Sequence, residues 1–207
     1  MSQIKRALIV IDVQNEYFTG NLRIEYPDVR ISLPNIGRAM DVAQAAGIPV
    51  VVVQHLAAEG APVFARGSVG AEIHPEIAGR PHDHQIEKSL ASCFVGTDLE
   101  AWLRERQINT LSIVGYMTHN CDDSTVRQAA HAGWKVELLH DAAGSLPYAN
   151  AIGSATAEEI HRVFTVVMHT GFAAVVSTDQ WLAAVAEHKA LSADNIYLSN
   201  QRAIAQR

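Results

Sequence analysis

The sequence predicts a three-layer α/β/α sandwich built around a mostly parallel, Rossmann-like central sheet. Short apolar runs alternate five times with segments whose apolar residues recur at helical spacing, and no internal repeat accompanies this alternation. The apolar runs are continuous, as in parallel strands that helices cover on both faces. With 207 residues, of which 48% are hydrophobic, the chain is expected to form a single domain over residues 1–207.

The first predicted strand covers residues 7–12 and ends at Asp12. Ligands of open α/β sheets bind beyond the carboxyl ends of the strands, so Asp12 is expected at the ligand-binding edge. Residues 13–33 lack a clear period and predict a long loop over that edge. A helix is then expected from Pro34 to Ala46, because proline is favoured in a first turn and apolar residues follow it at helical spacing.

The second predicted strand covers residues 48–54 and finishes at His55. Residues 56–87 are rich in Gly, Pro and His and show little periodicity, which predicts a long functional loop. Residues 97–100 read Thr-Asp-Leu-Glu, the pattern of a capping box, and predict the start of the next helix.

The second half of the chain continues the alternation of strands and helices. The expected elements are, in order, a strand over 110–114, a helix that begins near Cys121 and stops at Gly133, a strand over 136–140, a helix that the capping box of 156–159 opens and Gly171 ends, a strand over 172–176 and a helix from 178 to about 188. The tail from Ala190 onward has no predicted element, and we expect only that it docks on a partner subunit.

The composition argues against several classes of function. The formal net charge is −6 and no cluster of Lys and Arg appears, which disfavours nucleic acid and anionic membranes as partners. The longest apolar stretches, such as residues 48–53, are far shorter than a membrane span. Two cysteines and an N-terminus without a signal-peptide pattern favour the cytoplasm, and a small molecule is the expected substrate.

Cys121 is the candidate nucleophile. It follows a predicted buried strand and stands at the start of a predicted helix, where the macrodipole and free N–H groups stabilise a thiolate and a nearby oxyanion. A lone cysteine in such a place is equally well a small buried apolar residue. The expected convergence of Asp12, His55 and the residue 115–121 loop at one edge of the sheet favours the catalytic interpretation.

A cysteine hydrolase also needs a group that accepts the thiol proton and a group that orients or charges that acceptor. Asp12 is the candidate acid, and Lys88 is the candidate cation. By residue type alone, Lys88 could equally be a solvated surface charge, and Asp12 a helix cap or a metal ligand.

Three stretches of the chain resemble the isochorismatase-like cysteine hydrolases. They are residues 8–18 (Leu-Ile-Val-Ile-Asp-Val-Gln-Asn-Glu-Tyr-Phe), Glu87-Lys88 with residues 92–99, and residues 115–121 (Gly-Tyr-Met-Thr-His-Asn-Cys). Together they span nearly the whole chain in the order expected for that family, so the chain is identified as a member of it. The resemblance is strongest to a bacterial branch related to streptothricin hydrolase.

The resemblance implies roles for particular residues. Asp12, Lys88 and Cys121 would form a catalytic triad, with Asp12 as general acid and base and Lys88 as its charge partner. A cis peptide bond would join Tyr116 to Met117, and the N–H groups of Met117 and Cys121 would form an oxyanion hole. The implied reaction is hydrolysis of a non-peptide carbon–nitrogen bond in a small molecule, through a thioester on Cys121.

No metal and no organic cofactor is expected for this reaction. Nicotinamidases of the superfamily carry an Asp-x-His metal pattern after the second strand, and this chain departs from it at Gln54-His55. His74, His82 and His84 remain as possible ligands or as surface histidines. Members of the family form dimers and larger assemblies, so a homo-oligomer is expected.

Two other functions stay open. One is isochorismatase-type hydrolysis of a vinyl ether, in which Asp12 protonates the substrate and no nucleophilic cysteine is needed. The other is a catalytically silent binding protein. It is motivated by Asp122 and Asp123, because the family commonly has an apolar residue after the cysteine. One interpretation is that these acids interact favourably with the helix dipole. The other is that they face the thiol, where they would raise the thiol pKa or select a cationic substrate.

Further side chains in the predicted loops at the strand ends are candidate substrate contacts. They are Tyr17, Phe18, His55, Phe64, His119, Asn120 and Tyr148. Cys93, the second cysteine, is interpreted as structural.

Overall fold

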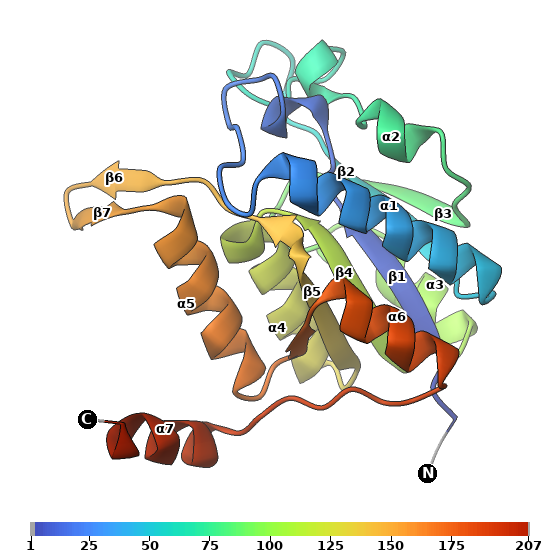
Figure 1. Ribbon diagram of the computed structural model, residues 1–207. Helices are drawn as coiled ribbons and strands as arrows, with labels where there is room; N and C mark the ends of the chain where they lie inside the picture. The colour runs from blue at the N-terminus through green and yellow to red at the C-terminus, as the bar shows by residue number, and fades with distance from the viewer. Residues whose placement is uncertain (1–2, 207) are drawn as a thin grey trace.

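The computed structural model describes residues 3–206 and confirms the predicted three-layer sandwich (Figure 1). Its central sheet contains β1 (Arg6–Ile11), β2 (Val50–His55), β3 (His84–Lys88), β4 (Thr110–Tyr116), β5 (Lys135–Gly144) and β8 (Ala174–Val176). The strand order is β3-β2-β1-β4-β5-β8, and every neighbouring pair is parallel. The α-helices are α1 (Val29–Ala45), α2 (Pro75–Ala78), α3 (Leu99–Glu105), α4 (Asp123–His131), α5 (Ala157–His169), α6 (Thr178–Ala186) and α7 (Ile196–Ala205).

Strand β1 lies in the middle of the sheet and is buried along its whole length. Ala7, Ile9 and Ile11 face one apolar cluster, to which α3, α4 and α5 contribute side chains. Leu8 and Val10 face the other, to which α1, α2 and α6 contribute. Helices therefore cover both faces of the sheet, which explains why the strands read as continuous apolar runs.

The strand order reverses direction between β1 and β4. From β1 the chain adds β2 and β3 on one side of the sheet, and then β4, β5 and β8 on the other. A crevice for ligands forms at such a switch point, outside the carboxyl ends of the two strands. Asp12 directly follows β1, and the turn that carries Cys121 follows β4, so topology brings these two residues to one place.

Helix α1 begins earlier than predicted, at Val29 rather than Pro34. The Asp28 side chain accepts a hydrogen bond from the Arg30 N–H and caps the helix. Pro34 lies inside the helix and is exposed. The prediction was wrong because proline was taken as the signal of a first turn, whereas the aspartate cap satisfies the helix start.

The stretch over residues 56–87 is more ordered than the predicted loop. It contains the short 3₁₀ helix η2 (Val69–Ala71), helix α2 and strand β3. Strand β3 lies at the edge of the sheet, and its outward-facing polar residues obscure it in the sequence. Another 3₁₀ helix, η1 (Asn15–Tyr17), interrupts the loop that was predicted after β1.

Residues 97–100 do not form the predicted capping box. Asp98 is the N-cap of α3 but makes no side-chain cap bond. Its carboxylate instead lies 3.0 Å from Nε2 of His84 on β3, and the Thr97 hydroxyl accepts from the Leu99 N–H. The second predicted capping box, between Thr156 and Glu159, is confirmed at the start of α5.

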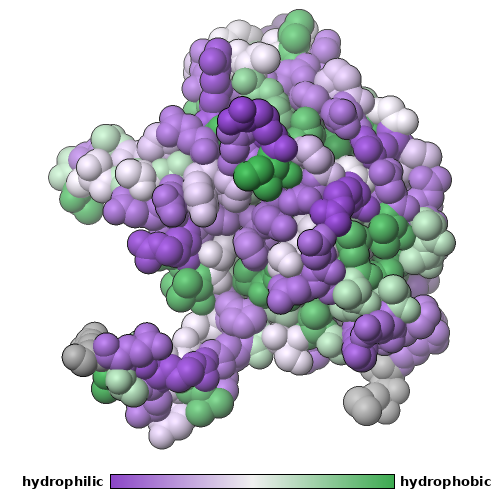
Figure 2. Space-filling view, in the orientation of Figure 1, coloured by the Kyte–Doolittle hydropathy of each residue, from purple (hydrophilic) through white to green (hydrophobic). Residues whose placement is uncertain are grey.

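The C-terminal third holds two elements that were not predicted. Strands β6 (Tyr148–Asn150) and β7 (Gly153–Ala155) form an antiparallel hairpin, and α7 follows the tail segment. Figures 1 and 2 show the hairpin and α7 projecting from the same side of the molecule, with a hollow between them. Helix α7 buries no side chain, and its exposed apolar residues include Ile196, Tyr197, Leu198 and Ile204.

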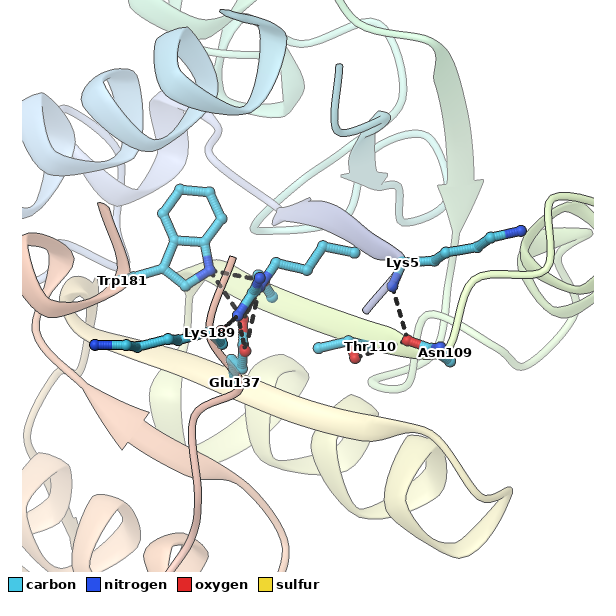
Figure 3. Close-up of polar contacts among 8 residues, drawn as sticks. Lys5, Asn109, Thr110, Glu137, Trp181 and Lys189 are labelled. Atoms are coloured by element: carbon cyan, nitrogen blue, oxygen red, sulfur yellow. Dashed lines mark hydrogen bonds and ion pairs between the residues drawn. The ribbon is translucent and has the colours of Figure 1, made fainter. Parts of the chain in front are cut away.

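A buried polar network links the strands at the end of the sheet that lies away from Asp12 and Cys121 (Figure 3). The Arg6 guanidinium on β1 donates to both carboxylate oxygens of Glu137 on β5. Ser112 on β4 and Trp181 on α6 also donate to Glu137. A further bond from Arg6 to the backbone oxygen of Lys189 fixes the chain where it leaves α6. Because every buried charge in this network is paired, it specifies the register of three strands without leaving an unsatisfied group.

No helix within residues 3–206 combines the length and apolar character that crossing a bilayer requires.

Candidate active site

Asp12, Lys88 and Cys121 meet at the switch point of the sheet. Lys88 Nζ lies 2.6 Å from Asp12 Oδ2 and 3.3 Å from Cys121 Sγ. Cys121 is 3% exposed, and the side chains of Asp12 and Lys88 are fully buried. The three residues lie 76 and 33 positions apart along the chain, so only the parallel order of the strands brings them together.

The end of β1 sets the direction of Asp12. Asp12 has a φ of 51°, in the left-handed region that non-glycine residues seldom adopt. Two residues later, the buried side chain of Gln14 accepts from the His55 N–H and donates to the His55 backbone oxygen. Gln14 thereby ties the carboxyl ends of β1 and β2 together. Gln14 was not among the predicted site residues, although it lies within the family motif of residues 8–18, two residues after Asp12.

Gly115 permits the close approach of β4 to β1 at this end. Its φ is +118°, and a Cβ atom built there would lie 2.0 Å from the backbone oxygen of Ile11. No other residue type fits without moving β1 and therefore Asp12. The next peptide bond but one, between Tyr116 and Met117, is cis, at the position that the family resemblance implied.

Cys121 lies in a single π-helical turn, η3 (Thr118–Asp122), and not in α4 itself. Helix α4 begins two residues later, at Asp123. The prediction of a cysteine at the first turn of a regular helix is therefore corrected: a wider turn inserts between strand and helix. Such π turns are often found at functional sites.

Burial sets the direction of the pKa shifts of Asp12 and Cys121. It raises the pKa of the Cys121 thiol, and the negative charge of Asp12 adds to that effect while Lys88 opposes it. Burial also raises the pKa of Asp12, against the opposing effect of Lys88. Asp12 and Cys121 are thus adjacent acids that share Lys88 as a positive neighbour. Because the two acids interact, their titrations are coupled and describe the pair rather than either residue alone.

Asp12 has one carboxylate oxygen that is free for proton transfer. Oδ2 accepts from Lys88, whereas Oδ1 is buried and has no hydrogen-bond partner within residues 3–206. A carboxylate oxygen of Asp12 and Sγ of Cys121 lie within 4.8 Å of each other. A small movement suffices to pass a proton between them.

The two acids after Cys121 have different surroundings. Asp123 forms an ion pair with Arg127 one turn along α4, at 2.8 Å. Asp122 is fully buried, and neither of its carboxylate oxygens has a partner among the described residues. Burial, followed by the charge of Asp12, raises the pKa of Asp122 well above its ordinary value. A neutral Asp122 neither stabilises nor opposes a thiolate by its charge.

His55 lies against the triad rather than in a free loop. Its Nδ1 is 3.3 Å from Lys88 Nζ, and its ring makes an edge contact with Phe64 at 5.3 Å between centroids. Burial and the neighbouring Lys88 lower the pKa of His55. The imidazole is therefore neutral near neutral pH, and Nδ1 is its acceptor.

A metal site does not fit this arrangement. Atoms of Asp12, His55 and Cys121 lie within 4.8 Å of one another, and within residues 3–206 they form the only such group of acidic, His and Cys side chains. The Lys88 ammonium, however, contacts all three. A second cation would have to share that place with a buried positive charge.

The other histidines proposed as metal ligands are engaged separately. His74 caps α2 and packs on the Phe18 ring, at 4.2 Å between centroids. His82 is exposed and hydrogen-bonds the Arg80 backbone oxygen. His84, as described above, pairs with an aspartate at the start of α3.

Several predicted substrate contacts form an aromatic wall beside the triad. The Tyr17 ring, 2% exposed, packs on Phe64 at 5.2 Å and on Tyr116 at 5.4 Å between centroids. Phe18 packs edge-on against Tyr116. Tyr17 and Phe64 are thus part of the core as well as of the wall, so their buried areas serve stability too.

The remaining candidates approach from η3 and the hairpin. His119 Nδ1 is 3.0 Å from Ser145 Oγ, and its ring meets Tyr148 edge-on at 5.0 Å between centroids. Burial lowers the pKa of His119 to about 4. Tyr148, on β6, is 46% exposed. Asn120 is exposed on η3.

Cys93 is fully buried, and its backbone N–H donates to the Thr125 hydroxyl. Burial raises its pKa to about 12. Among residues 3–206 both cysteines are free thiols, and only Cys121 contacts Lys88.

Several known proteins are similar to this chain in sequence or in fold. The sequence pattern of the Isochorismatase domain family matches residues 6–180. The crystal structure of a protein assigned as an isochorismatase, from Burkholderia xenovorans LB400, is 62% identical and covers 100% of this chain and 99% of its own, with a TM-score of 0.98.

Two curated enzymes are also similar to the chain. Streptothricin hydrolase of Streptomyces noursei is 31% identical over 137 residues, which are 66% of this chain and 49% of the enzyme. Nicotinamidase 3 of Arabidopsis thaliana is 27% identical over 187 residues, 84% of this chain and 85% of the enzyme.

Proposed function

Because this chain belongs to the isochorismatase family and is a hydrolase, we propose that it cleaves a non-peptide carbon–nitrogen bond of a small molecule with Cys121 as nucleophile. The observation that carries the proposal is the buried contact of Lys88 Nζ with both Asp12 and Cys121. A thiol, an acid with a free oxygen and a fixed cation are the groups that acyl transfer requires. The similarity to a nicotinamidase supports an amide as substrate.

In the first half of the reaction, Cys121 Sγ attacks the amide carbonyl carbon and its proton moves to Asp12. The Lys88 ammonium stabilises the negative charge of Asp12 and of the Cys121 sulfur, because it lies beside both groups. Asp12 then gives the proton to the amide nitrogen as the carbon–nitrogen bond breaks. The amine leaves, and a thioester remains on Cys121.

In the second half, a water molecule enters where the amine left. Asp12 removes a proton from the water while its oxygen attacks the thioester carbonyl. The carbon–sulfur bond breaks, the acid product departs and the proton on Asp12 returns to the Cys121 sulfur. The cycle uses no metal and no organic cofactor.

The developing oxyanion needs donors. We assign them to the backbone N–H groups of Met117, which lies between β4 and η3, and of Cys121, which lies within η3. Two such donors contribute about 10²-fold or more each to acyl transfer when they are preorganised. Tyr17, Phe18, His55, Phe64, His119, Asn120 and Tyr148 are the proposed substrate contacts.

We further propose that the whole chain acts as one domain and as a homo-oligomer in the cytoplasm. The support for an oligomer is the exposed apolar side chains of α5, α7 and the hairpin, among them Val166, Tyr197 and Ile152. Large exposed apolar patches mark protein interfaces. Light scattering that finds a monomer at micromolar concentration would overturn this part.

The test of the proposed function is a screen of small amides and enol ethers with wild type, Cys121→Ala and Asp12→Asn. We expect wild-type amide hydrolysis, loss of activity in both variants, and an acyl adduct on Cys121 by mass spectrometry of acid-quenched enzyme. Vinyl-ether activity that survives Cys121→Ala but not Asp12→Asn would establish the alternative reaction. A folded wild type that turns over nothing in the screen would favour a binding protein.

A further inference from the structure

The Lys88 ammonium has three acceptors for its three protons. Nζ lies 2.6 Å from Asp12 Oδ2, 3.3 Å from Cys121 Sγ and 3.3 Å from His55 Nδ1. Two of these acceptors belong to the proposed triad. The third belongs to a residue to which that mechanism assigns no part in proton transfer.

The backbone fixes His55 beside Lys88. The two residues are paired across the β2–β3 ladder, and the Lys88 backbone oxygen accepts from the Leu56 N–H. On the other side, Gln14 makes two hydrogen bonds to the His55 backbone. The ring of His55 makes an edge contact with Phe64. The backbone bonds and this ring contact together keep Nδ1 directed at the Lys88 ammonium.

We propose that His55 is a positioning residue, the fourth member of this site, which accepts the third proton of the Lys88 ammonium and so holds Nζ between Asp12 and Cys121. This inference rests on the proposed function of Cys121. It differs from a substrate contact, because the ring acts through Lys88 before any substrate binds.

The chemistry favours this assignment. An ammonium has no acceptor lone pair, and a fully buried one needs a partner for each N–H. Without Nδ1, one proton of Lys88 would be unsatisfied, and the flexible lysine side chain could move toward Asp12 and away from the sulfur. Because Nδ1 of His55 accepts from Lys88, the proton of the neutral imidazole lies on Nε2, and the tautomer is fixed.

The same contact disfavours a metal at this place. Asp12, His55 and Cys121 present ligand-type atoms within 4.8 Å of one another. The ammonium takes the central position and satisfies all three, so the site keeps one positive charge that cannot dissociate.

Other titratable groups also face the pair of Lys88 and His55. Asp12 approaches from the end of β1, Tyr17 from η1, Asp122 from η3 and Cys93 from the segment before α3. The charge of Cys121 acts on Tyr17, and the charges of Asp12 and Lys88 act on Asp122. Among the described residues, only His55 adds a third hydrogen-bond acceptor to Lys88.

The test uses two amide substitutions of the same residue. In His55→Asn the amide oxygen can reach the place of Nδ1, whereas in His55→Gln it reaches the place of Nε2. The measurement is the rate of Cys121 alkylation by iodoacetamide across the pH range, with mass spectrometry to separate Cys121 from Cys93. No substrate is present, so an effect on substrate binding cannot contribute. His82→Asn is the control, because His82 is exposed and lies outside the site.

We expect His55→Asn to retain the wild-type rate within about threefold and His55→Gln to lose about tenfold, the size of one hydrogen bond to a charged group. The control should match wild type. Equal rates in both variants, or loss in His55→Asn with retention in His55→Gln, would overturn the proposal. Slow labelling of wild-type Cys121 across the same range is a different result, because it would contradict the proposed function itself.

Discussion

Asp12 and Lys88 form a buried ion pair across strand β2, with 2.6 Å between Oδ2 and Nζ and no exposure of either side chain. Breaking such a pair leaves an uncompensated charge in the core. We expect Lys88→Met to lower the free energy of unfolding by about 3–5 kcal/mol. The measurement is urea denaturation at neutral pH.

The double variant Asp12→Asn/Lys88→Met should recover part of that loss, because both charges are then absent. Arg66→Ala provides the comparison, since its ion pair with Glu87 is more than half exposed at both ends, and it should cost less than about 1 kcal/mol. Equal costs at the two pairs would contradict the buried-pair argument.

Activity is expected to fall as the pH falls through the pKa of Asp12. Burial raises that pKa above 3.8, and the mechanism needs Asp12 ionised so that it can accept the Cys121 proton. Above that pKa the rate should form a plateau through neutrality, because burial and Asp12 also raise the thiol pKa. The measurement is kcat/KM for an amide substrate against pH.

A free thiol behaves differently, since its reactivity rises near pH 8.5. In Asp12→Asn the plateau should disappear, and the residual Cys121 alkylation should increase only in the alkaline range. A wild-type profile that rises through about pH 8.5 and has no plateau would contradict proton transfer within the pair.

Asp122→Asn is expected to stabilise the protein at neutral and alkaline pH. The folded-state pKa of Asp122 is raised well above the 3.8 of an ordinary aspartate, so the folded chain binds this proton more tightly than the unfolded chain. The contribution to stability is then fully present below about pH 4 and is lost as the pH rises toward the folded-state pKa.

The variant carries a neutral amide and escapes that loss. We expect the variant to be more stable than wild type near pH 8, with a difference that shrinks as the pH is lowered. Asp123→Asn is the matched control, because Asp123 pairs with Arg127 and its loss should cost about 0.5 kcal/mol. Thermal melting from about pH 5 to 8 measures both; an Asp122→Asn variant that is less stable at every pH would show that the carboxylate is ionised and paired.

Gly115→Ala is expected to be severely destabilising. The new methyl group would lie 2.0 Å from the Ile11 backbone oxygen, and φ is +118°. Relief of the clash must separate β1 from β4, so we expect a loss of more than about 4 kcal/mol together with loss of Cys121 reactivity.

Gly133→Ala separates the steric clash from the strain of a positive φ. Gly133 also has a positive φ, of +94°, but nothing lies within 4 Å of a Cβ atom there. This control should cost about 1 kcal/mol, through backbone strain alone. If both variants lose the same stability, the close approach of β4 to β1 is not the cause.

Much of the fold could be predicted because burial on both faces makes the central strands continuous apolar runs. β1, β2, β4 and β5 were found in this way, and the signals of Thr156 and Glu159 marked the start of α5 correctly. Strand β3 was missed because Ile86 is its only apolar residue and its other buried side chain is the charged Lys88. The hairpin and α7 were missed because they bury few or no apolar side chains in this chain.

The sequence by itself determined the fold class, through local periodicity, and the family, through motifs of a few residues. The candidate set of Asp12, Lys88 and Cys121 followed from that family resemblance. The sequence did not determine that His55 bonds Lys88, that Asp122 is buried without a partner or that Asp123 is paired. These facts depend on the register of β2 against β3 and on the π turn before α4. Neither follows from local propensity, because strand register and turn width are decided by contacts between residues that are far apart in the chain.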